Sequence, residues 1–319
     1  MRKRLIATLS ACLLLGTLTA CTPEPIVSVP SASMSTDVPA LRIEPLISPS
    51  GVNAQEGELV GHAYAAALKA AGIKAEVGTT PGSAQDAWSN LIAGSIDIVP
   101  AYSRELLSAA VPSVAPETPA DVLSALQEVL PESISVLDPA KAIVGDSLVV
   151  TAETAEKYQL KTIADLTKVC NKLLLGGTAD FQNSGRGLVG LGTDYNCVPK
   201  KFVVLKPLFD GSRDDVLWAL LRDDIQVADI HISAPAIDDN SLVVLTDTKK
   251  LFLEQNIVPL VSNSKVSAAA QGILNKVSAA LTTDELANLN RLAQDRHFAN
   301  SSEAAAAWLI QVGLVKAGS

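Results

Sequence analysis

Aromatic residues and histidines are scarce in this chain. Phe, Trp and Tyr make up 4% of its 319 residues, and the three histidines include no His-x-x-x-His pair. The sequence contains no Gly-x-Ser-x-Gly nucleophile motif, and no glycine-rich phosphate loop directly follows a predicted strand. Neighbouring carboxylates such as Asp223 and Asp224 point apart, which is typical of a solvated surface. These absences argue against an enzyme, a bound metal ion and any cofactor.

The chain is acidic, with a formal net charge of −9 at pH 7. An acidic body is repelled by the phosphates of nucleic acid and by anionic lipid headgroups. We therefore expect no nucleic acid among its partners and no electrostatic hold on a membrane, and we expect a monomer. Because 48% of the residues are hydrophobic and 18% are charged, the chain has enough apolar side chains for a sizeable core.

The first residues are typical of an export signal. Met1–Arg4 is cationic, Leu5–Leu18 is a short apolar run, and small residues then precede Cys21. The run is short for a permanent membrane helix. The Leu-Thr-Ala-Cys sequence resembles the bacterial lipobox, which implies removal of residues 1–20 and lipidation of Cys21 at the outer face of the cell membrane. Residues 21–40 are rich in Pro, Ser and Thr, so we expect a flexible tether.

Two cysteines remain once the signal and the lipid site are set aside. Cys12 leaves with the signal peptide and Cys21 takes the lipid, so Cys170 and Cys197 are left as a pair. Two leftover thiols in an oxidising compartment usually bond to each other. A metal site is the weaker alternative, because no histidine lies near either cysteine and their spacing matches no zinc pattern. We expect a disulfide.

Amphipathic helices alternate with short apolar strands along the body. Apolar residues recur at helical spacing over 84–92, before Gly94, and the sequence Thr118-Pro119 is typical of a helix start. Strands are predicted at 96–99, 134–137 and 172–175, among others. This alternation indicates an α/β fold with mostly parallel sheets.

Four stretches, in the same order, resemble the substrate-binding proteins of osmoprotectant ABC importers, which carry glycine betaine, choline and carnitine. Gly94–Ser103 is similar to the family's Gly-x-Ile-Asp-x-x-Pro-Glu-Tyr-Thr-Gly. Ala155–Leu166 is close to the family's segment entering the second lobe, and Asp180–Tyr195 is similar to its Phe-x-x-Arg-x-Gly-x-x-x-Leu-x-x-x-Tyr stretch. Leu281–Leu286 and Trp308–Leu314 resemble its C-terminal end. Together the four stretches span nearly the whole body.

The resemblance implies a two-lobed clamp of the type II periplasmic-binding-protein class, whose α/β lobes are joined by two crossing strands and close by hinge motion. Residues 41–138 and 242–319 are expected to form the first lobe, and residues 139–241 the second. The crossings are expected at Leu137–Ala140 and Ser241–Val244, side by side, with the C-terminal helices packed on the first lobe.

The function implied by this resemblance is that of an exported, lipid-anchored solute-binding protein. It delivers a small polar or zwitterionic solute to the permease subunits of an ABC importer. The alternative is a lipoprotein that keeps the clamp fold but serves as a sensor or partner-binding module without transport. The resemblance implies that the ligand lies between the lobes, where loops at strand ends meet.

The ligand contacts expected from these positions are Tyr102, Ser103, Ser50, Asn53, Gly145, Asp146, Ser147, Asp180, Phe181, Arg186 and His231. Family members that bind quaternary ammonium compounds hold the cation in a cage of aromatic rings. Tyr102 occupies a cage position, whereas His231 and Leu260 stand where the family has tyrosines. We therefore expect an incomplete cage and a more polar site, with Arg186 available to pair with a ligand carboxylate.

Overall fold

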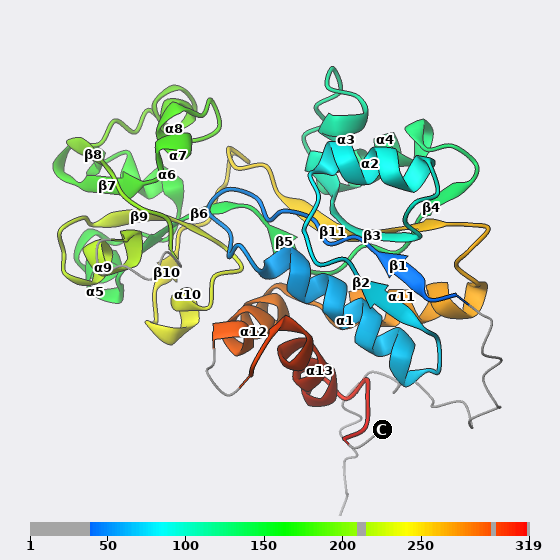
Figure 1. Ribbon diagram of the computed structural model, residues 1–319. Helices are drawn as coiled ribbons and strands as arrows, with labels where there is room; N and C mark the ends of the chain where they lie inside the picture. The colour runs from blue at the N-terminus through cyan, green and yellow to red at the C-terminus, as the bar shows by residue number, and fades with distance from the viewer. Residues whose placement is uncertain (1–38, 209–214, 295–297, 318–319) are drawn as a thin grey trace, which may run out of the picture.

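The computed structural model describes residues 39–208, 215–294 and 298–317. The predicted signal peptide, Cys21 and the tether up to residue 38 lie outside these ranges. Within them the chain forms two α/β lobes, each built on its own sheet, which lie side by side in Figure 1. None of the helices in these ranges is long and apolar enough to cross a membrane.

The first lobe contains a sheet with the strand order β2-β1-β3-β11-β4, formed by Ala75–Val77, Leu41–Ile43, Ile98–Tyr102, Gln255–Ser262 and Ile134–Val136. The short strand β5 (Ile143–Val144) also pairs with β11. The helices of this lobe are α1 (Glu56–Ala70), α2 (Ala84–Ile92), α3 (Ser103–Ala110), α4 (Pro119–Val129), α11 (Ala268–Ala280), α12 (Thr283–Gln294) and α13 (Ser301–Gln311).

The second lobe contains a sheet with the order β10-β6-β9-β7-β8, formed by Val243–Val244, Asp146–Val150, Val227–His231, Leu174–Gly177 and Lys201–Val204. Around it lie α5 (Ala152–Tyr158), α6 (Ile163–Leu166), the 3-10 turn Cys170–Lys172, α7 (Ala179–Asn183), α8 (Leu188–Tyr195), α9 (Val216–Leu221) and α10 (Ala236–Asp239).

The sequence predicted mostly parallel sheets, and this prediction is wrong, because both sheets are mixed. β1 is parallel to β2 and β3, and β7 is parallel to β8 and β9. The antiparallel strands are those beside the crossings: β11 runs against β3, β4 and β5, and β6 runs against β9 and β10. A strand that has just arrived from the other lobe enters its new sheet from the side facing that lobe. It therefore runs antiparallel to the strands beside it.

The chain passes between the sheets later than the sequence predicted. Ile143–Val144 still pairs with β11 of the first sheet, and Asp146–Val150 already belongs to the second, so the first crossing is at Gly145 rather than at 137–140. Val243–Val244 pairs with β6 inside the second lobe, and Phe252 still belongs to the core of that lobe. The return crossing therefore lies just before Gln255 and not at 241–244. The Asp138-Pro139 break is a bend within the first lobe.

Helix starts follow the local sequence signals closely. The Ser83 hydroxyl accepts the backbone N–H of Asp86 at 3.1 Å before α2, and the Thr118 hydroxyl accepts that of Asp121 at 3.2 Å before α4. Thr162 and Asp165 form a capping box at α6. A side-chain oxygen at each N-cap satisfies an N–H that has no partner within the helix.

The two lobes have separate cores, and the C-terminal helices belong to the first. Trp308 and Leu309 of α13 are buried in one cluster with Tyr64 of α1 and Ile43 of β1, so the predicted packing of the C-terminal helices is confirmed. Figure 1 shows α12 and α13 lying beside α1. The second lobe buries residues on both faces of its sheet. The predicted disulfide between Cys170 and Cys197 is also confirmed, with Cα atoms 5.4 Å apart.

Candidate ligand-binding site

The lobes touch at residues that follow the carboxyl ends of strands. Ser50 lies in the loop after β1, Asp180 in the first turn of the helix after β7, and His231 at the end of β9. The Ser50 hydroxyl donates to Asp180 Oδ2 at 2.6 Å, and His231 Nε2 lies 3.0 Å from the backbone oxygen of Ser50. Because a carbonyl oxygen only accepts, Nε2 carries the hydrogen. Four residues separated widely in sequence, Ser50, Asp146, Asp180 and His231, thus converge as expected, since His231 Nε2 is also 3.1 Å from Asp146 Oδ1.

The approach of the Ser50 loop to His231 depends on glycine. Gly51 has φ +87°, a left-handed conformation that residues with a Cβ rarely adopt. A Cβ on Gly51 would also lie 2.9 Å from the Cδ2 atom of His231. The absence of a side chain therefore lets this loop of the first lobe lie against the imidazole ring of the second.

Glu56, at the start of α1, is fully buried beneath this contact and accepts hydrogen bonds from both lobes. Its carboxylate accepts from the Tyr102 hydroxyl at 3.0 Å and from Asn290 Nδ2 at 2.6 Å, both in the first lobe. It also accepts from the hydroxyl of Ser233, which follows β9 of the second lobe, at 3.2 Å. Burial raises the pKa of Glu56, whereas these donors and the nearby His231 lower it by a smaller amount.

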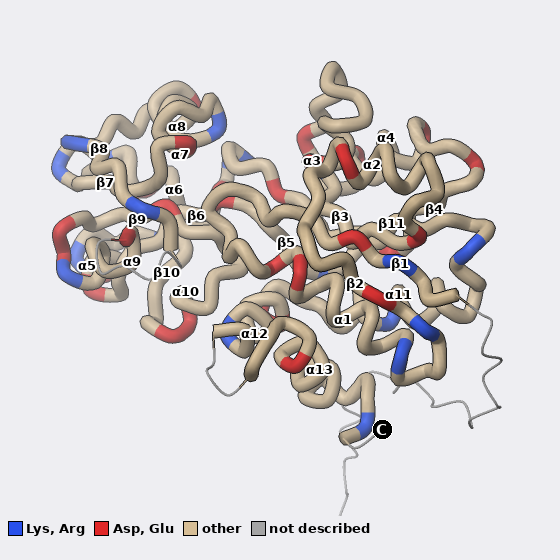
Figure 2. Tube along the Cα trace, in the orientation of Figure 1, with Lys and Arg blue, Asp and Glu red and all other residues tan. Residues whose placement is uncertain are grey.

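Other carboxyl groups gather around the same contact. Burial raises the pKa of Glu105, and burial together with the charge of Asp146 raises the pKa of Asp229 well above its usual value. The guanidinium of Arg104 is held by backbone carbonyl oxygens, including that of Glu254 at 2.7 Å, rather than by a carboxylate. Figure 2 shows acidic segments on the stretches between the two lobes, around β5 and β6. The contact region is therefore acidic.

Two hollows flank the contact, one on each lobe. The first, of about 590 Å³, lies at the carboxyl ends of β1 and β3 and is lined by Ser48, Ser83, Arg104, Glu105 and Gln255, among others. The second, of about 270 Å³, is lined by Gly145, Asp146, Ser147, Asp247, Phe252 and Glu254, among others. In open α/β sheets, ligands bind outside the carboxyl ends of the strands, which is where both hollows lie.

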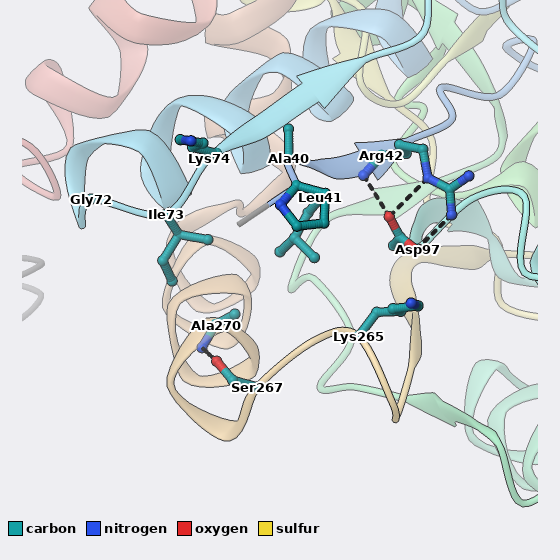
Figure 3. Close-up of a pocket in the computed structure, with 11 residues that line it drawn as sticks. Ala40, Leu41, Arg42, Gly72, Ile73, Lys74, Asp97, Lys265, Ser267 and Ala270 are labelled. Atoms are coloured by element: carbon teal, nitrogen blue, oxygen red, sulfur yellow. Dashed lines mark hydrogen bonds and ion pairs between the residues drawn. The ribbon is translucent and has the colours of Figure 1, made fainter. Parts of the chain in front are cut away.

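A hollow of about 640 Å³ lies at the opposite edge of the first lobe (Figure 3). It is bordered by the amino ends of β1, β2 and β3, and the Arg42 guanidinium beside it is paired with Asp97, Nη2 to Oδ1 3.0 Å. Lys74 and Lys265 also border it. None of the residues predicted to contact ligand lies there, so we place the candidate site between the lobes.

Several predicted contact residues form hydrogen bonds within their own lobe instead. Asn53 Nδ2 donates to Asn290 Oδ1 at 3.2 Å, and the buried Ser103 hydroxyl accepts the backbone N–H of Asn256 at 3.3 Å. Ser147 lines the smaller hollow, but its hydroxyl donates to the backbone oxygen of Ile230 at 2.5 Å. Position at a strand end predicted the neighbourhood of these residues but not the direction of their side chains.

Phe181 and Arg186 are not placed as the sequence suggested. Phe181 is buried in the second lobe, where its ring lies 6.2 Å from that of Phe202 and 5.9 Å from that of Phe252. Arg186 is exposed, and its Nη1 lies 3.4 Å from the backbone oxygen of Lys250. Neither takes part in the contact between Ser50, Asp180 and His231.

Residues 45–311 match the family described as the substrate binding domain of the ABC-type glycine betaine transport system. The chain belongs to this family. Its members are solute-binding proteins rather than enzymes, in agreement with the sequence analysis. The chain is also similar to the carnitine transport binding protein of Listeria monocytogenes, with 28% identity over 144 residues. That match covers 44% of this chain and 45% of the relative, so it spans less than half of either protein.

Solved structures confirm the two-lobed clamp of the family. A glycine betaine/carnitine/choline ABC transporter structure superimposes with a TM-score of 0.74 at 22% identity, covering 85% of this chain and 98% of that one. Apo YehZ from Escherichia coli gives a TM-score of 0.66 at 19% identity, with coverages of 86% and 99%. A lactococcal binding protein, closed on glycine betaine, gives 0.53 at 17% identity, covering 85% and 95%.

Most of the rings available for the cation cage implied by the family resemblance lie elsewhere in this chain. Tyr64 is in the first core with its hydroxyl 2.8 Å from that of Ser278, and Trp88 packs against the same core. Phe181 and Tyr195 are in the second core, and Trp218 lies on α9 and is 41% exposed. Tyr102 lies near the contact, but it is buried and its hydroxyl bonds to Glu56.

Glu56 and Asp229 were missed by sequence reasoning, although each carried a signal. Asn53 and Glu56 keep the spacing of Asn and Glu in the family's Asn-Phe-Thr-Glu-Gln, which these residues otherwise replace. Asp229 is the one carboxylate in β9 (Val227–His231), and its position resembles the Asp of the family's Asp-x-Tyr-Ser/Thr. A charged residue inside an apolar strand is rarely buried without a specific partner.

Proposed function

We propose that this chain is an extracytoplasmic solute-binding lipoprotein that delivers a small polar or zwitterionic solute to the permease of an ABC importer. The observation that carries the proposal is the contact of Ser50 with Asp180 and His231, which joins strand ends of two separate lobes. Hollows of about 590 and 270 Å³ flank this contact. The match to a carnitine transport binding protein and the likeness to a structure closed on glycine betaine support the same function.

The geometry favours binding by closure of the lobes. Gly51 and Ser50 come from the first lobe and His231 and Asp180 from the second, so a solute lying beside them would contact both. A solute that binds only the closed form shifts the population towards closure, by as much as its affinity for the two forms differs. No chemical step is required of the side chains at this site.

A thermal-shift screen of the mature chain tests the proposal. The compounds are betaines, choline, carnitine, amino acids and polyols, each at millimolar concentration. A solute that binds the folded chain alone stabilises it by mass action, and we expect at least one class to raise the melting temperature by roughly 2 °C or more. If every compound leaves the melting temperature unchanged, the result favours the alternative, a sensor or partner-binding module without transport.

The lipid anchor is a separate part of the proposal, supported by the Leu18–Cys21 sequence. In cells that process lipoproteins, we expect the wild-type chain in the membrane fraction and a Cys21→Ser variant in the soluble exported fraction. A single acyl chain already gives measurable membrane affinity, and additional chains make the attachment stable. Equal distribution of the two proteins between the fractions would exclude lipidation at Cys21. A Cys12→Ser variant is the matched control and is expected to behave as wild type.

A further inference from the structure

We propose that the solute is a small organic cation carrying N–H groups, bound by the carboxylates of the second lobe beside His231 rather than by a cage of aromatic rings. This inference rests on the proposed function and specifies the chemical class of its solute. It differs from a quaternary ammonium ligand such as glycine betaine, whose nitrogen has no hydrogen to donate.

Two unsatisfied acceptor atoms on one strand carry the inference. Among the buried side-chain nitrogen and oxygen atoms of the described residues, Asp229 Oδ1 and His231 Nδ1 have no hydrogen-bond partner. Both residues are 8% exposed. His231 Nε2 carries the hydrogen that Ser50 accepts, so in the neutral ring Nδ1 presents a lone pair. Most buried polar atoms have a hydrogen-bond partner. Two neighbouring acceptors without one therefore indicate a site for a ligand that donates hydrogen bonds.

The geometry of β9 and β6 places these acceptors on the same face of the sheet. Asp229 and His231 are two residues apart on β9, so their side chains lie on one side and their Cα atoms are separated by about 6.6 Å along the strand. Asp146 is the antiparallel partner of His231 and shares that face. Since Asp146 also approaches His231 Nε2, the two carboxylates and the imidazole bound one small region at the lobe contact.

The charge of this region favours a cation. Asp180 approaches it through Ser50, and the ion pairs among the described residues include none between a Lys or Arg side chain and Asp146, Asp180 or Asp229. Arg104 is bound to backbone oxygens, and Arg186 is at the exposed surface.

An N–H cation fits the unsatisfied acceptors better than a quaternary one. An ammonium, amidinium or guanidinium group donates charge-assisted hydrogen bonds to a carboxylate and to an imidazole lone pair. A trimethylammonium group donates none, so its attraction depends on ring faces. Of the rings near the lobe contact, that of Tyr102 is buried with its hydroxyl on Glu56. The ring of Phe252, which lines the smaller hollow, is buried in the second core beside Phe181.

Titration calorimetry of the mature full-length chain with graded N-methyl series tests the inference. The probes are ethanolamine through choline and glycine through glycine betaine, together with putrescine and agmatine as N–H cations without a carboxylate. We expect an N–H cation to bind, and within its series we expect at least a ten-fold loss of affinity when the last N–H is replaced by methyl.

Preference for choline or glycine betaine over the N–H members of its series would overturn the inference and leave the proposed function standing. If a polyol or another neutral solute binds and no N–H cation does, the inference is also overturned and the proposed function also stands. If nothing in these series or in the wider screen binds, the proposed function fails as well.

Asp229→Asn locates the effect in the site. The substitution keeps the size of the side chain and removes its charge, so we expect at least a ten-fold weaker binding of the N–H cation and a smaller difference between N–H and quaternary probes. Asp238→Asn, on an exposed residue of α10 in the same lobe, is the matched control and should bind within two-fold of wild type. An Asp229→Asn variant that folds and binds as tightly as wild type would overturn the inference.

Discussion

Glu56→Ala is expected to lower the free energy of unfolding by about 3–5 kcal/mol, because it removes a buried charged acceptor and leaves its donors unpaired. Those donors are the Tyr102 hydroxyl, Asn290 Nδ2 and the Ser233 hydroxyl, and Glu56 is fully buried. Ser233 is in the second lobe, so the substitution also removes a link between the lobes. Urea unfolding at pH 7 measures the loss.

Two variants separate this network from other effects of the substitution. Glu58→Ala removes a partly exposed carboxylate from the same helix turn, with Oε1 3.6 Å from His62 Nε2, and should cost less than about 0.5 kcal/mol. Glu56→Gln keeps the side-chain volume but replaces one acceptor oxygen by an N–H₂ donor, so an intermediate loss is expected. A loss below about 1 kcal/mol for Glu56→Ala would contradict the role assigned to the network.

Asp229→Asn is expected to stabilise the unliganded chain at pH 7 by roughly 1–3 kcal/mol, the size of the penalty for a buried polar group without a partner. Asp229 Oδ1 has no hydrogen-bond partner within the described part of the chain, and the carboxylate of Asp146 is the charge that acts on Asp229 from β6. An amide beside Asp146 can donate, whereas a second carboxylate repels it. A variant less stable than wild type at pH 7 would show that Asp229 has a partner in the unliganded chain.

The pH dependence of this gain has a definite sign. The pKa of Asp229 is raised well above 3.8, so the folded chain holds the proton more tightly than the unfolded chain. The contribution of this carboxyl to stability is therefore complete below about pH 3.8 and is lost as the pH rises towards the folded-state pKa. Because asparagine does not titrate, the advantage of Asp229→Asn should be greatest at neutral pH and should shrink towards pH 3. Melting temperatures of both proteins across this range measure it.

If both the stability result and the ligand result hold, Asp229 is a residue at which binding and stability oppose each other. The unliganded chain is destabilised by an unpaired carboxylate, and the cation that pairs with it restores the loss. Such opposition is common at binding sites, where groups are arranged for a ligand rather than for each other.

The helices and the disulfide could be predicted because their signals are local or few. The side chains of Ser83 and Thr118 accept hydrogen bonds from the backbone N–H groups three positions further on. The residues that fix the start of each helix therefore lie within one helical turn of each other in the sequence. Cys170 and Cys197 were the two thiols left after the signal and lipid sites were assigned, so their pairing required no knowledge of the sheet. The two-lobed fold followed from resemblance along most of the body.

The crossings could be predicted only approximately. The Asp138-Pro139 break is a real bend, but whether the next residues stay in the first sheet depends on β11, more than a hundred residues later in the chain. In the same way, Val243–Val244 has the apolar character of any strand, and its pairing with β6 decides to which lobe it belongs.

The sequence by itself determined the composition of the site: an acidic chain with few rings, His231 where the family has a tyrosine, and polar residues at strand ends. The tertiary structure alone decided which of these polar groups are satisfied. Tyr102 bonds to Glu56, Asn53 to Asn290 and Ser147 to a backbone oxygen. Asp229 Oδ1 and His231 Nδ1 have no hydrogen-bond partner among the residues that the structure describes. The physical reason is that a hydrogen bond requires atoms to meet within about 3 Å, and such meetings between distant segments are set by the packing of whole lobes rather than by neighbours in sequence.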